Sequence, residues 1–315
     1  MNAGTVVALT GATGFVGQAV VEEACRRGIA LRALARREQS ACAGVEWVRG
    51  DLADRAALAA LVRGAAAVLH VAGVVNTPDP TGFHIGNVSG TQALLESASA
   101  AGVRRFVFVS SLAAREPGLS AYGRSKRQAE QAVEASGLEW TIVRPPAIYG
   151  PRDREILELF KAARWGVVPM PAGSASIVHV ADLARLLVTL SATGEGATGQ
   201  GAALAATNGQ IYEPDDQRAG GWPNRELAHA IGAAVGRRVW SPALSKPVLA
   251  ALASLDDRLR GAGAKLTRDR VGYMTHPDWV SRPDRAPPAT LWQPEIATPE
   301  GLAATAAWYR QHGWL

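Results

Sequence analysis

Short apolar runs alternate with amphipathic stretches along the first half of the chain. The runs are rich in Val, Ala and Leu and cover residues 6–10, 30–34, 45–49, 67–71, 105–110 and 140–143. Between them, stretches with the helical period begin near Phe15, Arg55, Asn87 and Tyr122. Apolar strands separated by helices are typical of a parallel sheet that is covered on both faces. We therefore predict an α/β fold, a doubly wound parallel sheet of the Rossmann type.

The pattern changes at residues 144–151, which contain Pro145, Pro146 and Pro151. Because proline lacks the N–H group with which a strand residue donates a hydrogen bond to the neighbouring strand, this segment is expected to interrupt the sheet. Short helical stretches and six of the nine tryptophans follow from Trp222 onward. We predict an NADP-binding domain at residues 1–150 and a smaller, mostly helical substrate-binding region at 151–315. Residues 177–190 are expected to return to the first domain as a further strand and helix of its sheet.

Composition and charge narrow the class of protein. The 315 residues are 48% hydrophobic and 19% charged, which suits a folded protein with a sizeable core. The net charge is +5, and residues 236–286 carry ten Lys or Arg against five Asp or Glu, an excess of five. The rest of the chain is therefore neutral, which argues against a nucleic-acid partner. The same basic stretch leaves open a peripheral contact with a membrane.

Cysteine content and the N-terminus bear on the cellular compartment. Two cysteines, Cys25 and Cys42, form no disulfide framework and suit a reducing environment. No signal-type segment and no stretch with the length of a membrane span is recognised. We expect a cytoplasmic monomer or homodimer, with peripheral contact at the inner membrane face left open.

A glycine-rich turn joins the first strand to the first helix with the spacing GxxGxxG. The first glycine permits a tight turn, the second lets the backbone approach a pyrophosphate, and the third lets helix and strand pack closely. The anion then meets free N–H groups at the helix N-terminus. The predicted dinucleotide contacts in this turn are Gly11, Thr13, Gly14, Phe15, Val16 and Gly17.

The end of the second strand predicts the type of dinucleotide. Arg36 and Arg37 stand there, and no acid occurs before Glu38. An acid at this place binds the ribose 2′-hydroxyl of NAD, whereas an arginine accommodates the 2′-phosphate of NADP. We predict NADP(H), with Arg36 as the main contact. Asp51 and Leu52 follow the third strand and are placed to meet the adenine, although Asp51 suits a plain turn as well.

Tyr122 and Lys126 lie four residues apart, which puts them on one face of a helix. A free tyrosine has a pKa near ~10, and a neighbouring ammonium with a nicotinamide cation would favour the phenolate. Ser111 ends the fifth strand, at the sheet edge where α/β proteins place their sites. Its hydroxyl can hold a substrate carbonyl beside the tyrosine. No metal is predicted to take part.

With these residues, the chain resembles the extended or atypical short-chain dehydrogenases/reductases of the NAD-dependent epimerase/dehydratase family. Residues 70–73, 87–91, 144–151, 179–184 and 292–309 also match the family. The resemblance implies that Ser111, Tyr122 and Lys126 form a catalytic triad, and that Asn87 supports the lysine through a water molecule. It further implies cofactor contacts at Val71, Ala72, Gly73, Pro145 and Ile148. His70 and His179 are expected to be structural.

Two features depart from the family pattern. Ser111 and Tyr122 are eleven residues apart, closer than in sugar-nucleotide epimerases, which points toward a branch that includes non-catalytic subunits of respiratory complex I. Leu112 and Ala113 stand where the dehydratases carry an Asp-Glu pair, so dehydration is disfavoured. Two alternatives to a reductase stay open, a nucleotide-sugar epimerase and a non-catalytic NADP-binding assembly subunit.

The substrate is expected to be large and apolar. Residues 145–147, Pro-Pro-Ala, are similar to reductases of apolar ketones and replace the Asn-bearing segment of epimerases. Residues 247–259 are apolar near the helical period, which fits a core helix, a lid over a tunnel or an interfacial helix. Residues 266–279 resemble bacterial keto-lipid reductases, including those of oxidised ceramide. We expect NADPH-dependent reduction of a ketone on a sphingolipid-type keto-lipid or a steroid-like molecule.

Overall fold

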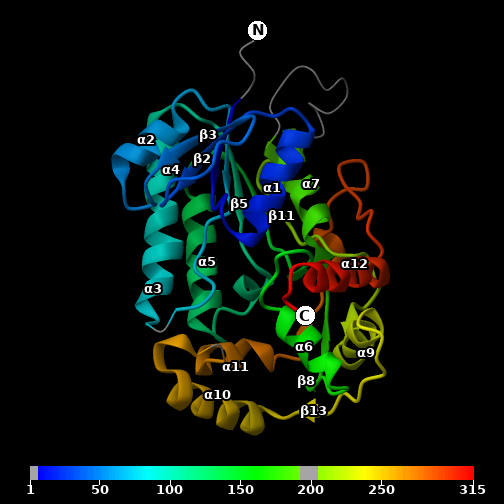
Figure 1. The fold of residues 1–315 in the computed structure, drawn as a ribbon. Coiled ribbons are helices and arrows are strands. Elements are labelled where there is room, and N and C mark those ends of the chain that lie inside the picture. The colour runs from blue at the N-terminus through cyan, green and yellow to red at the C-terminus, as the bar shows by residue number, and fades with distance from the viewer. Residues whose placement is uncertain (1–5, 78, 192–204, 265) are drawn as a thin grey trace.

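The computed structural model describes residues 6–77, 79–191, 205–264 and 266–315. Within these residues the central element is a seven-stranded parallel sheet with the strand order β11-β6-β5-β4-β1-β2-β3 (Figure 1). The strands are β1 Val7–Thr10, β2 Leu31–Ala35, β3 Val45–Arg49, β4 Ala67–His70, β5 Arg105–Val109, β6 Glu139–Val143 and β11 Gln210–Tyr212. The order reverses between β1 and β4, where doubly wound folds bind dinucleotides. The predicted fold class is confirmed, and the six predicted strands agree with β1–β6 to within one residue at each end.

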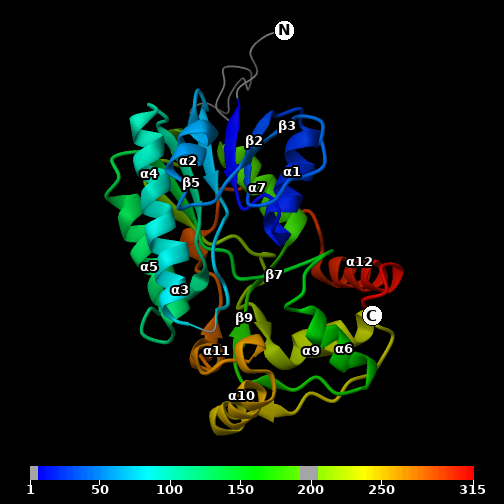
Figure 2. The same ribbon diagram turned by 60° about the vertical axis from the view of Figure 1, so that its left-hand side comes forward.

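Helices cover both faces of this sheet (Figure 2). On one face lie α1 (Phe15–Arg26) and α7 (Val180–Ser191), and on the other lie α2 (Arg55–Val62), α4 (Gly90–Ala100) and α5 (Ala121–Glu134). Successive residues of a strand point to opposite faces, so Val7 and Leu9 join the first buried cluster and Ala8 joins the second. The inner strands β1 and β4 are therefore buried along their whole length, whereas β3 at the sheet edge carries Glu46 and Arg49.

The strand predicted at the start of residues 177–190 does not join the main sheet. Ile177–His179 (β10) pairs instead with Ala147–Tyr149 (β7) in a separate two-stranded parallel sheet. The edge beside β6 is already taken by β11, which extends the pairing through the Arg144 N–H to the Tyr212 carbonyl oxygen at 2.7 Å. The expectation about this strand is wrong for that reason, whereas α7 does return to pack against α1.

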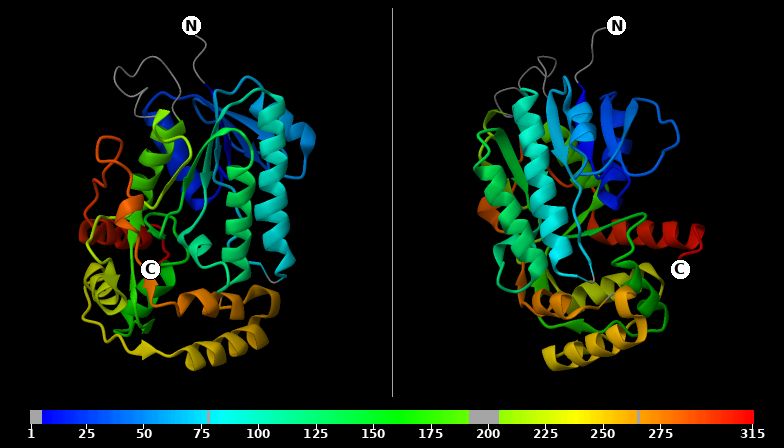
Figure 3. Two further views of the ribbon diagram at one scale, coloured as in Figure 1. Left: turned by 180° about the vertical axis from the view of Figure 1, so that it is seen from behind. Right: turned by 90° about the vertical axis from the view of Figure 1, so that its left-hand side faces the viewer.

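The C-terminal region is mostly helical, as expected. Helices α6 (Leu157–Arg164), α9 (Asn224–Ala234) and α12 (Thr298–Gln311) share one buried cluster. Short strands complete it, with β12 (Trp222–Pro223), β9 (Ser174–Ala175) and β14 (Asp278–Trp279) in one sheet and β13 (Ala243–Leu244) with β8 (Met170–Pro171) in another. Helices α10 (Lys246–Arg260) and α11 (Arg268–Met274) lie beyond them, at the end of the molecule opposite the N-terminus (Figure 3). The domain boundary near residue 150 stays a prediction.

Single helical turns fill the remaining connections. A short α3 (Thr81–Phe83) continues into the π-helical turn His84–Ser89, which leads directly into α4. Within the described residues, 3₁₀ turns occur at Leu112–Arg115, Gly261–Gly263 and Pro283–Arg285. The π-helical turn is the one that carries Asn87, and such turns frequently occur at functional sites.

Helix α11 docks directly on the start of α5. A Cβ atom at Gly272 would lie 2.1 Å from the carbonyl oxygen of Leu119, so only glycine allows this approach. The Asp269 carboxylate accepts hydrogen bonds from the N–H groups of Ala121 at 2.5 Å and Tyr122 at 3.4 Å. Because the first N–H groups of a helix lack partners within it, Asp269 caps α5 from a distant part of the chain. The C-terminal region thereby positions the helix that carries Tyr122.

The contact at Gly272 yields a stability prediction. Gly272→Ala should lower the free energy of unfolding by about 1–3 kcal/mol, because overpacking against a backbone carbonyl outweighs the better helix propensity of alanine. Gly263→Ala is the matched control, since no heavy atom lies within 4 Å of a Cβ there. Denaturant unfolding measures both variants. Equal stability of the two would contradict the close packing of α11 on α5.

Candidate active site

The glycine-rich turn forms a tight corner between β1 and α1. Gly11 has φ +76°, and a Cβ atom there would lie 2.6 Å from the backbone nitrogen of Ala72. A Cβ at Gly17 would lie 2.0 Å from the Gly11 carbonyl oxygen, whereas one at Gly14 would meet only that oxygen, at 3.3 Å. The first and third glycines are therefore required by packing within the protein. The second glycine, Gly14, leaves free space on its exposed side.

The start of α1 offers free amide groups to an anion. Its first helical hydrogen bond runs from the Gln18 N–H to the Gly14 carbonyl oxygen at 2.9 Å, so the amides of residues 15–17 precede it. Thr13 and Gly14 are exposed at the tip of the turn, and Phe15 and Val16 are half-buried beside it. Amides, helix dipole and the open glycine fit a dinucleotide pyrophosphate.

Arg36 and Arg37 are exposed immediately beyond β2, the neighbour of β1. No acidic side chain in the described parts of the chain pairs with either of them. Asp51 accepts a hydrogen bond from the Ala53 N–H at 2.8 Å and so forms a turn of its own. Leu52 packs toward α4, within 2.8 Å of where a Cβ at Gly90 would lie. The adenine contact predicted for Asp51 and Leu52 stays a prediction.

A chain of hydrogen bonds passes through the buried imidazole of His70. The Thr10 hydroxyl lies 2.6 Å from Nδ1, and Nε2 lies 2.9 Å from the Thr91 hydroxyl, which itself donates to the Asn87 carbonyl oxygen at 2.6 Å. Because Thr91 uses its proton on Asn87, it must accept from His70, which places the imidazole proton on Nε2. Burial lowers the pKa of His70 to about 3, so the ring is neutral. This geometry suits the structural role expected of His70.

Asn87 holds the backbone beside the lysine. Its side-chain oxygen accepts from the Val74 N–H at 2.7 Å, and its amide donates to the Val74 carbonyl at 2.9 Å and to the Ser125 hydroxyl at 2.9 Å. A Cβ at Gly73 would lie 3.3 Å from the Asn87 oxygen and 3.6 Å from Lys126 Nζ. The structure thus brings Asn87, Gly73 and Lys126 together. The water-mediated role of Asn87 stays a prediction.

Lys126 is buried and oriented by the strand that precedes it. Its Nζ donates to the Val109 carbonyl oxygen at 2.8 Å and lies 4.4 Å from the centre of the Phe108 ring. Desolvation lowers the pKa of Lys126 to about 8, and the Glu130 carboxylate opposes that shift. The ammonium form therefore still predominates at neutral pH.

Ser111 and Tyr122 meet at the edge of the sheet. Desolvation raises the pKa of Tyr122 to about 12, and the nearby Ser111 side chain opposes that shift. The phenol of the protein alone is therefore protonated, and the lowering of its pKa by Lys126 together with a nicotinamide cation stays a prediction. A protonated phenol is the form that donates a proton.

Two aromatic rings that the sequence did not indicate flank Tyr122. The rings of Phe83 and Tyr273 have their centres 5.8 Å and 6.2 Å from that of Tyr122. Arg270 donates to the Tyr273 hydroxyl at 3.3 Å and pairs with Glu155. These residues give the site an apolar wall with one cation at its rim. No motif in the sequence links Tyr273 to Tyr122, which lies on a helix from the other half of the chain.

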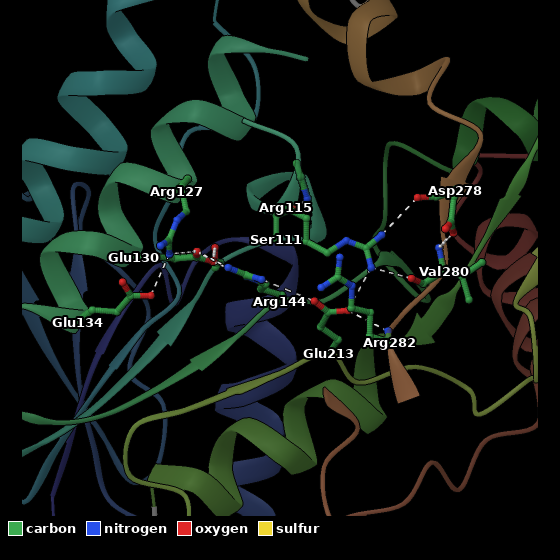
Figure 4. Close-up of polar contacts among 12 residues, drawn as sticks. Ser111, Arg115, Arg127, Glu130, Glu134, Arg144, Glu213, Asp278, Val280 and Arg282 are labelled. Atoms are coloured by element: carbon green, nitrogen blue, oxygen red, sulfur yellow. Dashed lines mark hydrogen bonds and ion pairs between the residues drawn. The ribbon is translucent and has the colours of Figure 1, made fainter. Parts of the chain in front are cut away.

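Behind the end of β5, buried ion pairs form a continuous chain (Figure 4). Glu130 of α5 accepts from the Ser110 hydroxyl at 2.6 Å and from two nitrogens of Arg144 at 2.8 and 2.7 Å. Arg144 Nη1 is 3.7 Å from a carboxylate oxygen of Glu213, and the other oxygen of Glu213 is 3.2 Å from Arg115. Both carboxylates are fully buried, so each depends on its arginine partner.

The far end of this chain reaches the C-terminal region. Arg115 donates to the carbonyl oxygens of Val280 at 2.8 Å and Asp278 at 3.2 Å, and the Arg282 N–H donates to Glu213 at 2.9 Å. At the opposite end, Arg127 bridges Glu130 and Glu134. The ion-pair chain therefore ties the Tyr122 helix, the end of β5 and strand β14 into one unit, as Figure 4 shows.

Of the remaining predicted cofactor residues, Val71, Ala72 and Pro145 directly follow strands of the main sheet. Val71 and Ala72 follow β4, and their N–H groups bond to the carbonyl and hydroxyl oxygens of Thr10 at 3.3 Å each. Pro145 is buried, and its carbonyl oxygen accepts from the Leu112 N–H at 3.1 Å. Ile148 lies in β7, outside the main sheet. Among the described residues, no group of three or more His, Cys, Asp or Glu could hold a metal ion.

Comparison with protein families gives a match to this part of the molecule. The family described as NAD(P)H-binding matches residues 11–191, more than half of the chain. The chain belongs to this NAD(P)H-binding family of short-chain dehydrogenases/reductases. The family predicted from the glycine turn and the Tyr-Lys pair is thereby confirmed. As a member, the chain is an NAD(P)-dependent oxidoreductase.

Two curated relatives extend the similarity over the whole of this short-chain dehydrogenase/reductase. It is 36% identical to the ceramide reductase of Caulobacter vibrioides (strain NA1000 / CB15N), over 98% of this chain and 96% of that protein. It is 30% identical to the 2-alkyl-3-oxoalkanoate reductase of Stenotrophomonas maltophilia (strain K279a), over 94% and 97%. The structure of MoeE5 in complex with UDP-glucose and NAD has the same fold, with a TM-score of 0.72, 21% identity and coverage of 98% and 99%.

The neutral state of His70 yields a prediction about acid stability. Its pKa is about 3 in the fold, against a free value of about 6.5, so between these values the unfolded chain binds about one more proton. The free energy of unfolding should therefore fall as the pH drops below about 6.5, and by up to about 1.4 kcal/mol per pH unit from this group.

His70→Gln removes this contribution, so its stability should depend less steeply on pH between about 6.5 and 4 than that of the wild type. Exposed His229 supplies the control variant His229→Gln, which should keep the wild-type slope. Denaturant unfolding across that pH range measures all three proteins. Parallel curves for wild type and His70→Gln would show that His70 is not held neutral.

Proposed function

We propose that this enzyme reduces a ketone to a secondary alcohol on a large apolar substrate with NADPH, and that the substrate is a keto-lipid of the oxidised-ceramide type. The observation that supports this most is the pairing of Tyr122 with Ser111. Desolvation keeps the phenol protonated, and a serine hydroxyl lies against it at the sheet edge. That arrangement suits protonation of an oxygen held at the same point.

In this reaction the residues of the chain would have the following roles. Ser111 holds the ketone oxygen, and Tyr122 gives its hydroxyl proton to that oxygen. The buried Lys126 ammonium, which donates to the Val109 carbonyl oxygen, would hold the nicotinamide ribose and supply positive charge near the bound cofactor. When bound, the reduced nicotinamide supplies the hydride for the carbonyl carbon.

The preference for NADPH is inferred from the end of β2. Arg36 and Arg37 are exposed there without an acidic partner among the described residues, and a 2′-phosphate would complete such a pair of cations. A site specific for NAD would normally carry an acidic residue at this point, which binds the free ribose 2′-hydroxyl.

A variant of Arg36 tests the cofactor assignment. Arg36→Ala should weaken NADPH binding by about 1.5–3 kcal/mol, because it removes a charge-assisted hydrogen bond, and should leave NADH binding nearly unchanged. Calorimetric titration of both dinucleotides measures this, with Arg63→Ala, an exposed arginine after α2, as the control. Tighter binding of NADH than NADPH by the wild type would assign the enzyme to NAD instead.

Support for the apolar substrate comes from the walls of the site. Phe83 and Tyr273 flank Tyr122, and Pro145 and Pro146 follow β6 where an amide-bearing segment would suit a nucleotide. The two whole-chain relatives are both named as reductases, one of them of ceramide. A UDP-glucose 4-epimerase of Vibrio cholerae is also similar, at 27% identity over 58% of this chain. A role as a non-catalytic subunit would not need Ser111, Tyr122 and Lys126 together.

The function is tested by NADPH oxidation against keto-lipids of increasing chain length, ketosteroids and UDP-sugars. For keto-lipids, kcat/KM should rise with chain length, because each buried CH₂ contributes about 0.8 kcal/mol until the site is filled. Tyr122→Phe should lower kcat about 10²–10⁴-fold with NADPH affinity retained. Tyr273→Phe keeps its ring and should stay active. Turnover of UDP-sugars alone, or a fully active Tyr122→Phe enzyme, would refute this function.

A further inference from the structure

Helix α10 exposes a continuous apolar stripe. Val248, Leu252, Leu255 and Leu259 are 46%, 44%, 51% and 75% exposed. They are four, three and four residues apart, so they lie along one side of the helix. A row of four exposed Val and Leu side chains is unusual on a protein surface that contacts only water.

The stripe is not needed to hold α10 in the fold. A different side of the helix, with Leu249 and Ala253, packs against Val271 of α11. The sequence grouped Leu249 with the other leucines of residues 247–259, but the structure separates it from them. Helix α10 thus has one apolar side that faces the protein and another that faces outward.

A basic group accompanies the stripe. Arg258 is exposed on a flank of the stripe, whereas Arg260 pairs with Asp256 at 3.3 Å and Lys246 lies in line with Ala250 on the far side of the helix. Lys265, which belongs to the basic stretch 236–286, lies outside the described residues. A helix with apolar side chains on one surface and Lys or Arg beside them is the pattern of a helix that lies in a membrane interface.

The position of α10 agrees with a contact at a large flat surface. It lies at the extreme end of the molecule in every view, opposite the N-terminus (Figures 1 and 3). The exposed Trp240 stands shortly before β13, which leads directly into α10. Exposed tryptophans are common at membrane–water interfaces. No helix in the described part of the chain could span a bilayer, so the contact would be peripheral.

We propose that the outer stripe of α10 docks this protein on the surface of an anionic phospholipid membrane. A second copy of the chain fits the surface less well, because an antiparallel pairing of two α10 helices would set their basic ends against each other. Anionic headgroups complement these charges and leave the leucines to enter the interface.

The docked orientation also concerns the site. Helix α11 packs between α10 and the start of α5, and its Tyr273 lies beside Tyr122. The membrane surface would therefore lie next to the apolar wall of the site. An apolar substrate could then pass from lipid to Tyr122 without crossing bulk water. This last step rests on the proposed function, whereas the membrane contact itself does not.

The test is flotation of the full-length protein with vesicles of phosphatidylcholine alone and of equal phosphatidylcholine and phosphatidylglycerol. The wild type should bind the anionic vesicles at least about tenfold more tightly, and salt should weaken the binding. Leu255→Glu should lower this affinity at least about tenfold, because it places a charge in the stripe. Arg258→Gln should lower it by about fivefold.

Ala250→Glu is the matched control, since it adds the same charge on the opposite exposed side of α10 and should bind more tightly than Leu255→Glu. Thermal melting confirms that each variant is folded. Absence of binding to anionic vesicles, or equal binding by both Glu variants, would overturn the proposal. So would a wild-type dimer that Leu255→Glu converts to a monomer.

The membrane contact and the proposed function can be refuted independently of each other. Vesicle binding needs neither cofactor nor ketone, so its loss with ketone reduction intact would remove only the membrane contact. Binding to anionic vesicles without turnover of any ketone would instead remove the proposed function and leave the docking surface in place.

Discussion

The structure depends most on two carboxylates buried behind the end of β5, Glu130 and Glu213. Each ion taken out of water costs several kcal/mol, and only well-placed partners offset that cost. Arg144 lies between the two, bonded bidentately to Glu130 and 3.7 Å from Glu213. Because Ser110 donates to Glu130, the residue before Ser111 and the helix that carries Tyr122 are held by the same carboxylate. The spacing of the candidate catalytic pair therefore follows from a buried electrostatic constraint.

The same constraint explains why the C-terminal region cannot be treated as a cap that is simply added to the nucleotide-binding part. Glu213 is satisfied partly by Arg115, whose other hydrogen bonds go to carbonyl oxygens near β14. Asp269 then caps α5 from α11. Two independent contacts, one ionic and one at a helix terminus, thus join the C-terminal region to the helix of Tyr122. Movement of α11 would change the surroundings of the phenol directly.

The sequence predicted the parts that depend on neighbours along the chain. Strands β1–β6, the glycine turn and the Tyr-Lys spacing follow from local periods and motifs, because each needs only a few consecutive residues. The prediction from sequence was wrong where the pairing of a strand depends on competition from residues far away in the chain. Strand β10 pairs with β7 because β11 occupies the edge of β6, and nothing within residues 177–190 reveals that. Likewise Tyr273 and Glu213 reach the site from far along the chain, and neither stands in a recognisable motif.

The apolar segment of α10 shows a limit of a different kind. Its leucines were assigned to one helical face, yet Leu249 is 3% exposed and Leu259 is 75% exposed. Counting from Val248 instead gives a second stripe, so the apolar residues cover a wider arc than one packed face needs. A helix attached only to its own domain gains nothing from apolar side chains on its outward side, because they remain in water. The width of the apolar arc therefore indicates a second apolar environment, and the exposed Arg258 on its flank favours one that is anionic.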